Sequence, residues 1–252
     1  MSLRTQSKPT PAAKPKSIFA RRVRDERDWR NVERVPKRYL VSENSKTGIS
    51  INFPVSTTCK PTKVCQQICY ACRMPSHIAM PNALRKAWTT YYYFEDNEVA
   101  VIAERLYREF KIFERRIGLK KLRWNGVGDL FPKAVEVLNY MAEHYDVTHL
   151  VYSRRPEMIN QLIVSPRLHV LYSLDESSWQ RWTEVTRPTT AFGYLRTSDF
   201  VPPIPLSVVL RAHRQWKELP DHKADCPVDA HVIPHTHGCI GCNICKARGL
   251  KD

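Results

Sequence analysis

The sequence predicts an α/β protein whose core is a partial (β/α)6 barrel followed by a small cysteine-rich C-terminal extension. Two observations support this prediction. Six short apolar segments alternate with helical or loop segments, which is typical of parallel strands joined by crossovers. In addition, the eight cysteines fall into two groups, one after the first predicted strand and one near the C-terminus.

The six predicted strands follow one another along the middle of the chain. Ile49, Ile51 and Phe53 alternate with polar residues, which predicts the first strand, and a proline ends it. The other five are the apolar segments 121–124, 147–153, 168–174, 190–195 and 206–211. Six β/α units in this length suit a partial TIM-like barrel better than a complete eight-unit barrel.

Helix boundaries are visible at three places. Apolar residues recur at helical spacing before Gly118, which predicts a helix that Asp96 or Asn97 caps and Gly118 ends. Pro132 suits the first turn of the next helix. A further helix, rich in charged residues, is expected nearer the N-terminus, within residues 21–38.

The composition indicates a folded and basic protein. Hydrophobic residues make up 42% of the 252 residues and charged residues 26%, which excludes wholesale disorder. No apolar run approaches the ~20 residues that cross a bilayer, and no apolar segment follows the basic start, so we expect a cytoplasmic protein without a membrane partner. The net charge of +15 favours a polyanionic partner, such as nucleic acid.

Three regions are expected along the chain. Residues 1–38 form a basic, partly disordered arm, because prolines and lysines alternate there and its first 34 residues contain ten basic and four acidic side chains. Residues 39–217 form the barrel-like domain. Residues 218–252 form the cysteine-rich extension that binds a metal or a cluster.

The first cysteine group is the most specific motif. Cys65, Cys69 and Cys72 form a C-x3-C-x2-C triplet directly after the first predicted strand. This spacing resembles the signature of the radical S-adenosylmethionine (SAM) superfamily. The resemblance implies that three thiolates hold three irons of a [4Fe–4S] cluster, whose fourth iron binds SAM. The chain departs from that signature at Ala71, where the family usually has an aromatic residue, and has Tyr70 one place earlier.

Two alternatives stay open for this group. Cys59 adds a fourth thiol, so Cys59, Cys65 and Cys69 form a rival triplet with Cys72 spare. The segment Cys69-Tyr-Ala also resembles the cysteine motif of phage-encoded gene-product-88-like proteins, which favours the rival triplet. The second alternative is a zinc site made of all four thiols, although zinc knuckles usually pair two C-x2-C units and only one occurs here.

A glycine-rich segment after the second predicted strand supports the same resemblance. Gly126, Gly128 and Asp129 stand where radical SAM proteins carry a Gly-Gly-Glu-like motif, and gene-product-88-like proteins carry a Gly-Asp-Phe-like segment. The resemblance implies that the glycines let SAM approach the backbone and that Asp129 accepts a hydrogen bond from its ammonium group.

Polar residues at later strand ends extend this predicted site, because the carboxyl ends of barrel strands carry the site. Ser153 and Asp175 are assigned to cofactor binding, and Asp175 can accept from ribose hydroxyls. Arginines at strand ends can bind a carboxylate or a phosphate: Arg154, Arg155, Arg196 and Arg211.

The second cysteine group suits an auxiliary cluster. It consists of a C-x2-C-x2-C run and one upstream cysteine: Cys226, Cys239, Cys242 and Cys245. Four thiolates leave no open iron, so the group predicts a structural or electron-transfer [4Fe–4S] cluster, and it resembles the C-terminal segment of several radical SAM subfamilies. The alternative is zinc held by some of these cysteines and by His235 and His237.

The motifs together predict an enzyme that cleaves SAM reductively to a 5′-deoxyadenosyl radical and then modifies a substrate. Charge points to nucleic acid or a nucleotide as that substrate, and the reaction needs an electron donor as a partner. The alternative is a non-catalytic, metal-stapled protein that binds nucleic acid. Its support is the charge, the zinc-capable cysteines and aromatic residues such as those at 91–94.

Overall fold

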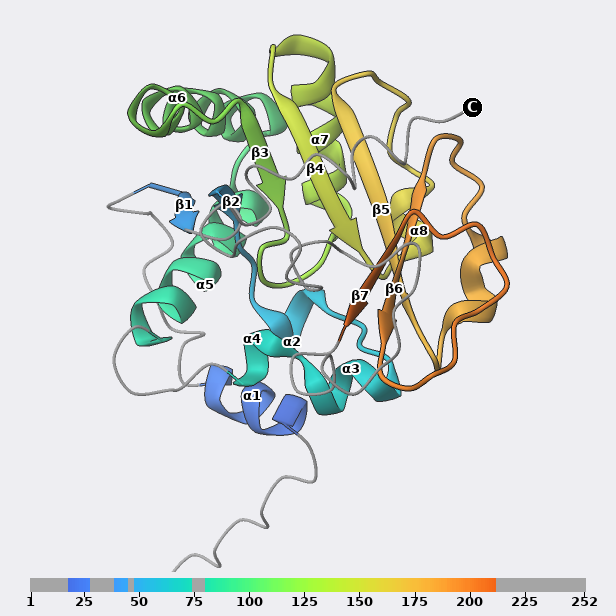
Figure 1. Cartoon of the computed structure of the whole chain (residues 1–252). Coiled ribbons are helices and arrows are strands. Elements are labelled where there is room, and N and C mark those ends of the chain that lie inside the picture. Colours follow the sequence, from blue (N-terminus) through green and yellow to red (C-terminus); the bar gives the residue numbers. More distant parts are fainter. Residues whose placement is uncertain (1–17, 28–38, 45–47, 74–79, 212–252) are drawn as a thin grey trace, which may run out of the picture.

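A seven-stranded sheet forms the centre of the computed structural model, which describes residues 18–27, 39–44, 48–73 and 80–211 (Figure 1). The spatial order of the strands equals their order in the chain. β1 is antiparallel to β2, and every later neighbouring pair is parallel. The strands are β1 (Val41–Asn44), β2 (Gly48–Ile51), β3 (Lys121–Trp124), β4 (Thr148–Ser153), β5 (Leu168–Asp175), β6 (Ala191–Arg196) and β7 (Val208–Arg211).

The α/β class and the six predicted strands are confirmed as β2 to β7, with bounds that shift by at most two residues. The short strand β1 was not expected, because its sequence Val-Ser-Glu-Asn lacks an apolar pattern. The sheet is not closed, since β1 and β7 form its two edges. The partial barrel therefore stays a prediction.

The described residues also contain eight α-helices and one 3-10 helix, of which α1 precedes the first strand and the others lie between strands. They are α1 (Ile18–Arg27), α2 (Val55–Thr58), α3 (Lys63–Ile68), α4 (Tyr70–Arg73), α5 (Met80–Asp96), α6 (Val99–Ile117), α7 (Pro132–His144), α8 (Pro156–Ile159) and η1 (Trp179–Glu184). Each parallel connection leads to the next strand on the same side of the sheet. Right-handed crossovers therefore place all of the connecting helices on one face of the sheet. Figure 1 shows α7 behind β4.

The helix predictions are confirmed in part. Gly118 ends α6 in the left-handed conformation with φ 70°, and Pro132 opens α7. The prediction that Asp96 or Asn97 caps α6 is wrong, because the N-cap is Glu98. The Asn97 side chain instead donates a hydrogen bond to a backbone carbonyl of the preceding helix, α5. The helix expected within 21–38 is described as α1, and residues 28–38 lie outside the description.

The main core lies between the sheet and helices α5, α6 and α7. Burial alternates along β4, because one face of the strand meets this core. Phe94 of α5 is buried and meets Phe53 and Trp124 edge-on, at ring centroid distances of 5.1 and 6.3 Å. The aromatic residues at 93 and 94 therefore belong to the core. None of the described helices combines the length and apolar character needed to span a bilayer.

A buried histidine lies in this core at the amino end of β4. The His149 Nδ1 atom accepts a hydrogen bond from Trp124 Nε1 at 3.1 Å. Burial, with a smaller contribution from the charge of Arg167, lowers the pKa of His149 from 6.5 to about 3. His149 is therefore neutral in the folded protein at neutral pH.

This low pKa predicts a pH-dependent stability. The folded state disfavours the proton, so the contribution of neutral His149 is fully present above pH 6.5 and is lost as the pH falls towards 3. We expect this group to lower the free energy of unfolding by up to about 1.4 kcal/mol per pH unit in that window. Urea unfolding of the wild type and of His149→Gln, which keeps an acceptor for the indole, checks it. Equal pH slopes for the two proteins would contradict the expectation.

Candidate functional site

The first cysteine group lies at the edge of the sheet where the parallel strands end. In Figure 1 the arrowheads of β3 and β4 point towards helices α2, α3 and α4, which follow β2, and α1 lies beneath them. Helix α1 packs against all three of these short helices. The group therefore occupies the side of the sheet where α/β proteins place their sites.

The cysteines of the first group lie in and at the ends of short helices that follow β2. Cys59 caps the end of α2, Cys65 lies within α3, Cys69 caps the end of α3, and Cys72 lies in α4. The Thr62 side chain accepts a hydrogen bond from the Cys65 backbone N–H at 3.1 Å, and this cap starts α3. The helices bring three of the sulfur atoms together.

The thiols of Cys65 and Cys72 both donate hydrogen bonds to the Cys69 sulfur. These two bonds lower the pKa of Cys69 to about 3, and they raise the pKa values of Cys65 and Cys72 well above the usual range, together with burial. Cys59 stands apart from this chain of bonds. Burial, followed by the charges of Asp129 and Cys69, raises the pKa of Cys59.

Two arginines place positive charge near the ends of this thiol triplet. Arg154 opposes the rise in the pKa of Cys65, and Arg22 opposes the rise in the pKa of Cys72. Both act in the direction that favours an anionic sulfur. The triplet is therefore a place where negative charge is stabilised.

Within the described ranges, no group of three or more His, Cys, Asp or Glu side chains is arranged so that it could hold a metal ion. The second cysteine group and its two histidines lie outside these ranges: Cys226, His235, His237, Cys239, Cys242 and Cys245. Arg211 ends β7 as predicted.

Asp175 joins the cysteine segment to the sheet. This fully buried carboxylate accepts from the Thr62 hydroxyl, from Arg154 Nη1 at 2.6 Å, from the Ser177 hydroxyl at 2.8 Å and from the Ser178 hydroxyl at 3.2 Å. Burial by itself raises the pKa of Asp175, but the Arg154 charge and the hydrogen bonds outweigh it, and the pKa lies below its usual value. The predicted ribose acceptor is thus bound to protein groups.

Asp129 and Ser153 are brought together, as the sequence predicted for two residues of one site. The Asp129 Oδ1 atom accepts from the Ser153 hydroxyl at 2.6 Å and from the Leu130 N–H at 2.7 Å, and Oδ2 accepts from the Arg154 N–H at 3.2 Å. Burial raises the pKa of Asp129 despite these bonds. This carboxylate therefore joins the ends of β3 and β4, and its role toward an ammonium group stays a prediction.

The two glycines of the motif are required by contact with the segment that follows β2. A Cβ atom on Gly128, which has φ 86°, would lie 2.6 Å from the Phe53 carbonyl oxygen. A Cβ atom on Gly126 would lie 2.5 Å from Asn52 Oδ1. Close packing on the protein backbone is thus sufficient to explain Gly128, whereas the atoms that Gly126 meets belong to the side chains of Asn52 and Ser50.

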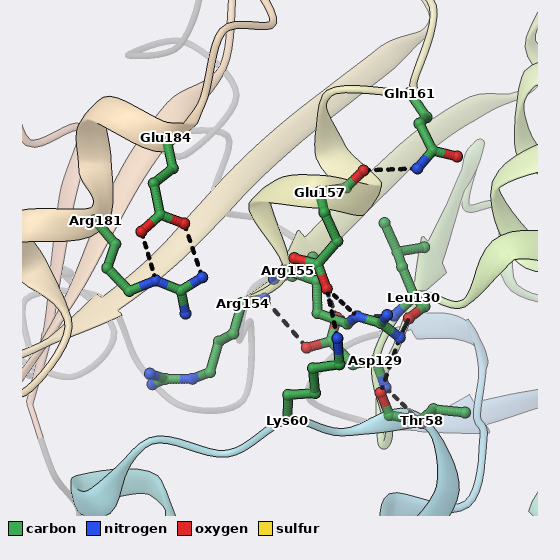
Figure 2. Close-up of polar contacts among 11 residues, drawn as sticks. Thr58, Lys60, Asp129, Leu130, Arg154, Arg155, Glu157, Gln161, Arg181 and Glu184 are labelled. Atoms are coloured by element: carbon green, nitrogen blue, oxygen red, sulfur yellow. Dashed lines mark hydrogen bonds and ion pairs between the residues drawn. The ribbon is translucent and has the colours of Figure 1, made fainter.

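Arg155 connects three segments around the same edge. Its Nη1 donates to the Leu130 carbonyl at 2.8 Å, and its Nε donates to Glu157 Oε1 at 3.0 Å. Lys60 of the cysteine segment donates to the same Glu157 oxygen at 3.1 Å. Figure 2 shows these contacts, with Arg154 directed away from Arg155. Arg196 likewise donates to carbonyls of its own loop, those of Ser198 and Asp199.

Sequence reasoning missed Glu26, which holds α1 on the cysteine segment. Its fully buried carboxylate accepts from Arg22 Nε at 2.7 Å, from the Val55 N–H at 3.3 Å and from the Ser56 N–H at 2.8 Å. Nothing local in the sequence signals this contact, because its partners in α2 are about 30 residues away. Thr62 could have been found, since a threonine directly before a helical segment is a capping signal.

The fold and the site define an α/β protein that gathers three thiols at the carboxyl edge of an open, mostly parallel sheet. The chain belongs to the Gene product 88 family, whose model matches residues 23–248. This range contains both cysteine groups and every predicted site residue. No curated protein and no solved structure matches the chain. The resemblance to gene-product-88-like proteins is confirmed, and the radical SAM resemblance stays a hypothesis.

The glycine contacts predict a difference between two alanine variants. Gly128→Ala combines a positive φ with overlap on backbone atoms, so we expect it to lower the free energy of unfolding by about 2–5 kcal/mol. Gly118→Ala also has a positive φ, but no atom lies within 4 Å of its added Cβ, so a loss of about 1–2 kcal/mol is expected. Denaturant unfolding measures both. Similar losses would mean that the Phe53 backbone moves away without cost.

Asp175→Asn is predicted to loosen the cysteine segment. Replacing the buried partner of Arg154 should cost about 3–5 kcal/mol of stability near neutral pH. Because the folded pKa of Asp175 is lowered, its contribution is present above the usual carboxyl pKa and disappears as the pH falls through the folded value. Asp146→Asn is the control, since that ion pair includes a carboxylate side chain that is 95% exposed. Urea titrations at neutral and acidic pH compare the variants, and equal stability of both would refute the role.

Proposed function

We propose that this protein is an iron–sulfur enzyme of the radical SAM type. Cys65, Cys69 and Cys72 would hold a [4Fe–4S] cluster, and SAM would bind beside it across the carboxyl ends of the strands. The observation that supports this most strongly is the hydrogen-bonded thiol triplet at the carboxyl edge of a sheet whose parallel strands follow in sequential order. The sequential order also favours the partial barrel.

The donor set of the triplet fits a cluster of this kind. All three donors are sulfur atoms, which iron–sulfur clusters prefer. Each thiolate of a cubane binds a different iron, so the three sulfur atoms, which are in hydrogen-bond contact here, would move apart to hold it. Cys59 takes no part in the thiol–thiol hydrogen bonds, which favours Cys65, Cys69 and Cys72 over the rival set that includes Cys59. When bound and reduced, the cluster supplies the electron that cleaves SAM to a 5′-deoxyadenosyl radical.

The chain's own residues would position and shield this chemistry. Arg22 and Arg154 provide positive charge beside the thiolates and would stabilise an anionic cluster. Helix α1, held by Glu26, covers the cysteine helices and would limit the access of water to them. Gly126, Gly128, Asp129, Ser153 and Asp175 border the same edge, where we propose that SAM lies.

The second cysteine group would bind an auxiliary [4Fe–4S] cluster, with zinc as the alternative ligand of that site. We further propose an electron donor as partner, a cytoplasmic location, and nucleic acid or a nucleotide as substrate, because the net charge is +15. A metal-stapled protein that binds nucleic acid without catalysis is the competing hypothesis.

Cysteine variants test the assignment of the triplet. We expect Cys65→Ala, Cys69→Ala and Cys72→Ala each to lose SAM cleavage and the absorbance of this cluster, while an auxiliary cluster on the second cysteine group keeps its own, because the proposed SAM-binding cluster has only these three thiolate ligands. Cys59→Ala is the matched control, since it removes the neighbouring thiol, and it should retain both. If Cys59→Ala lost the cluster and SAM cleavage while Cys72→Ala kept both, the cluster would be reassigned to Cys59, Cys65 and Cys69.

Metal analysis of the anaerobically purified protein tests the function itself. Iron and acid-labile sulfide in equal amounts, with production of 5′-deoxyadenosine from SAM under reducing conditions, is the expected result. Zinc without sulfide, persisting after reconstitution with iron and sulfide, would overturn the proposal and favour the non-catalytic binding protein.

A further inference from the structure

Polar residues gather on the face of the sheet opposite the main core, near the ends of β2, β3 and β4. Trp124 is fully buried in the main core, so its strand neighbour Arg123 lies toward the opposite face, and Asn125 follows the end of β3. Ser50 of β2 is paired with Arg123 in the sheet register, and Tyr152 lies on β4. We call Ser50, Arg123, Asn125 and Tyr152 the polar face.

Arg123 has no ion-pair partner among the described residues. Its guanidinium carbon lies 4.3 Å from the centre of the Tyr152 ring, and this stacking fixes its direction. The Nε atom is buried and has no hydrogen-bond partner among the described residues. A buried guanidinium donor is costly unless an acceptor satisfies it, and an anionic acceptor does so best.

Asn125, two residues further along the chain, has an unsatisfied acceptor and contacts the same residue, Tyr152. This residue is 5% exposed and has φ 57°, a left-handed conformation that is costly for a residue other than glycine. Its Nδ2 donates to the Tyr152 carbonyl at 3.1 Å, which orients the amide. Its Oδ1 is buried and accepts no hydrogen bond from the described part of the chain. Backbone strain together with an unsatisfied buried acceptor is typical of a ligand-binding position.

The two unsatisfied atoms describe the ligand that would fit them. Arg123 Nε lacks an acceptor, which an anionic oxygen would supply, and Asn125 Oδ1 lacks a donor, which an O–H or N–H group would supply. An ordered water can satisfy Asn125, but it does not neutralise Arg123. A nucleotide offers both groups, since its phosphate is anionic and its sugar and base carry O–H and N–H donors. The net charge of +15 also favours phosphate-bearing ligands.

We propose that the polar face is the substrate-binding surface of the candidate site and that it takes a nucleotide. The phosphate would bind Arg123, and a hydroxyl or N–H group would donate to Asn125. Asn125 directly precedes the glycine motif, and Tyr152 directly precedes Ser153, so this surface borders the edge that carries the thiols. The inference rests on the proposed function, because it names the substrate class of that enzyme.

Calorimetric titration of the full-length, anaerobically purified protein with AMP, GMP, CMP and UMP tests the inference. We expect saturable binding of at least one of them, weakened about tenfold or more by Arg123→Gln and by Asn125→Gly. Glycine removes the Oδ1 acceptor and accepts the positive φ without strain, so Asn125→Gly should remain folded. Should Arg123→Gln fail to fold, Arg123→Lys keeps the charge but lacks Nε and is expected to bind more weakly than the wild type.

Arg108→Gln is the matched control for charge. It also removes one positive charge, but its side chain is 74% exposed on α6, so affinity should change by less than about twofold. Absence of saturable binding, unchanged affinity in both polar-face variants, or equal weakening by Arg108→Gln would each overturn the inference. SAM cleavage without added nucleotide, assayed on the same preparations, tests the proposed function separately. Cleavage without nucleotide binding would refute the polar face alone. Binding without cleavage would refute the enzyme, and with it the role of the polar face as a substrate site, although the face would still bind a nucleotide.

Discussion

The geometry of the candidate site depends on the burial of Asp175. Burying a carboxylate lowers the stability of the folded state by several kcal/mol unless hydrogen-bond donors surround it. The donors that bind Asp175 are therefore held in fixed positions. Those partners come from separate segments: Arg154 follows β4, and Thr62 caps the helix that contains Cys65. One buried charge therefore fixes the distance between the cysteine segment and the end of the sheet.

Two further carboxylates repeat this arrangement around the same edge. Asp129 joins the ends of β3 and β4 through Ser153, and Glu26 joins α1 to the start of α2. The cysteine helices have only a small apolar cluster of their own, built on Val55, Ala71 and Cys72. Because so little apolar area holds these helices, the polar connections decide where the thiols lie.

This arrangement divides the polar residues of the edge into two kinds. Asp129, Asp175 and Arg155 have their hydrogen bonds satisfied by the protein and serve mainly to hold segments together. Arg123 and Asn125 have buried atoms without a partner in the described residues, although neither stood out in the sequence. On our proposals the thiol triplet supplies the chemistry and the polar face supplies recognition.

The sequence by itself determined the six parallel strands, the end of α6 at Gly118 and the start of α7 at Pro132, because periodicity, glycine and proline act locally. It also located the first cysteine group and the glycine motif, but it left open which three of the four cysteines act together. The tertiary structure alone decided β1, the short helices that carry the cysteines, the contact of Glu26 with α2 and the partners of Asp175. Helix α5 belongs to this second set as well, since its threonine and aromatic residues have low helix propensity and packing on Phe53 and Trp124 stabilises it. These features depend on residues that are distant in the chain, and no local pattern records which distant group will satisfy a buried charge.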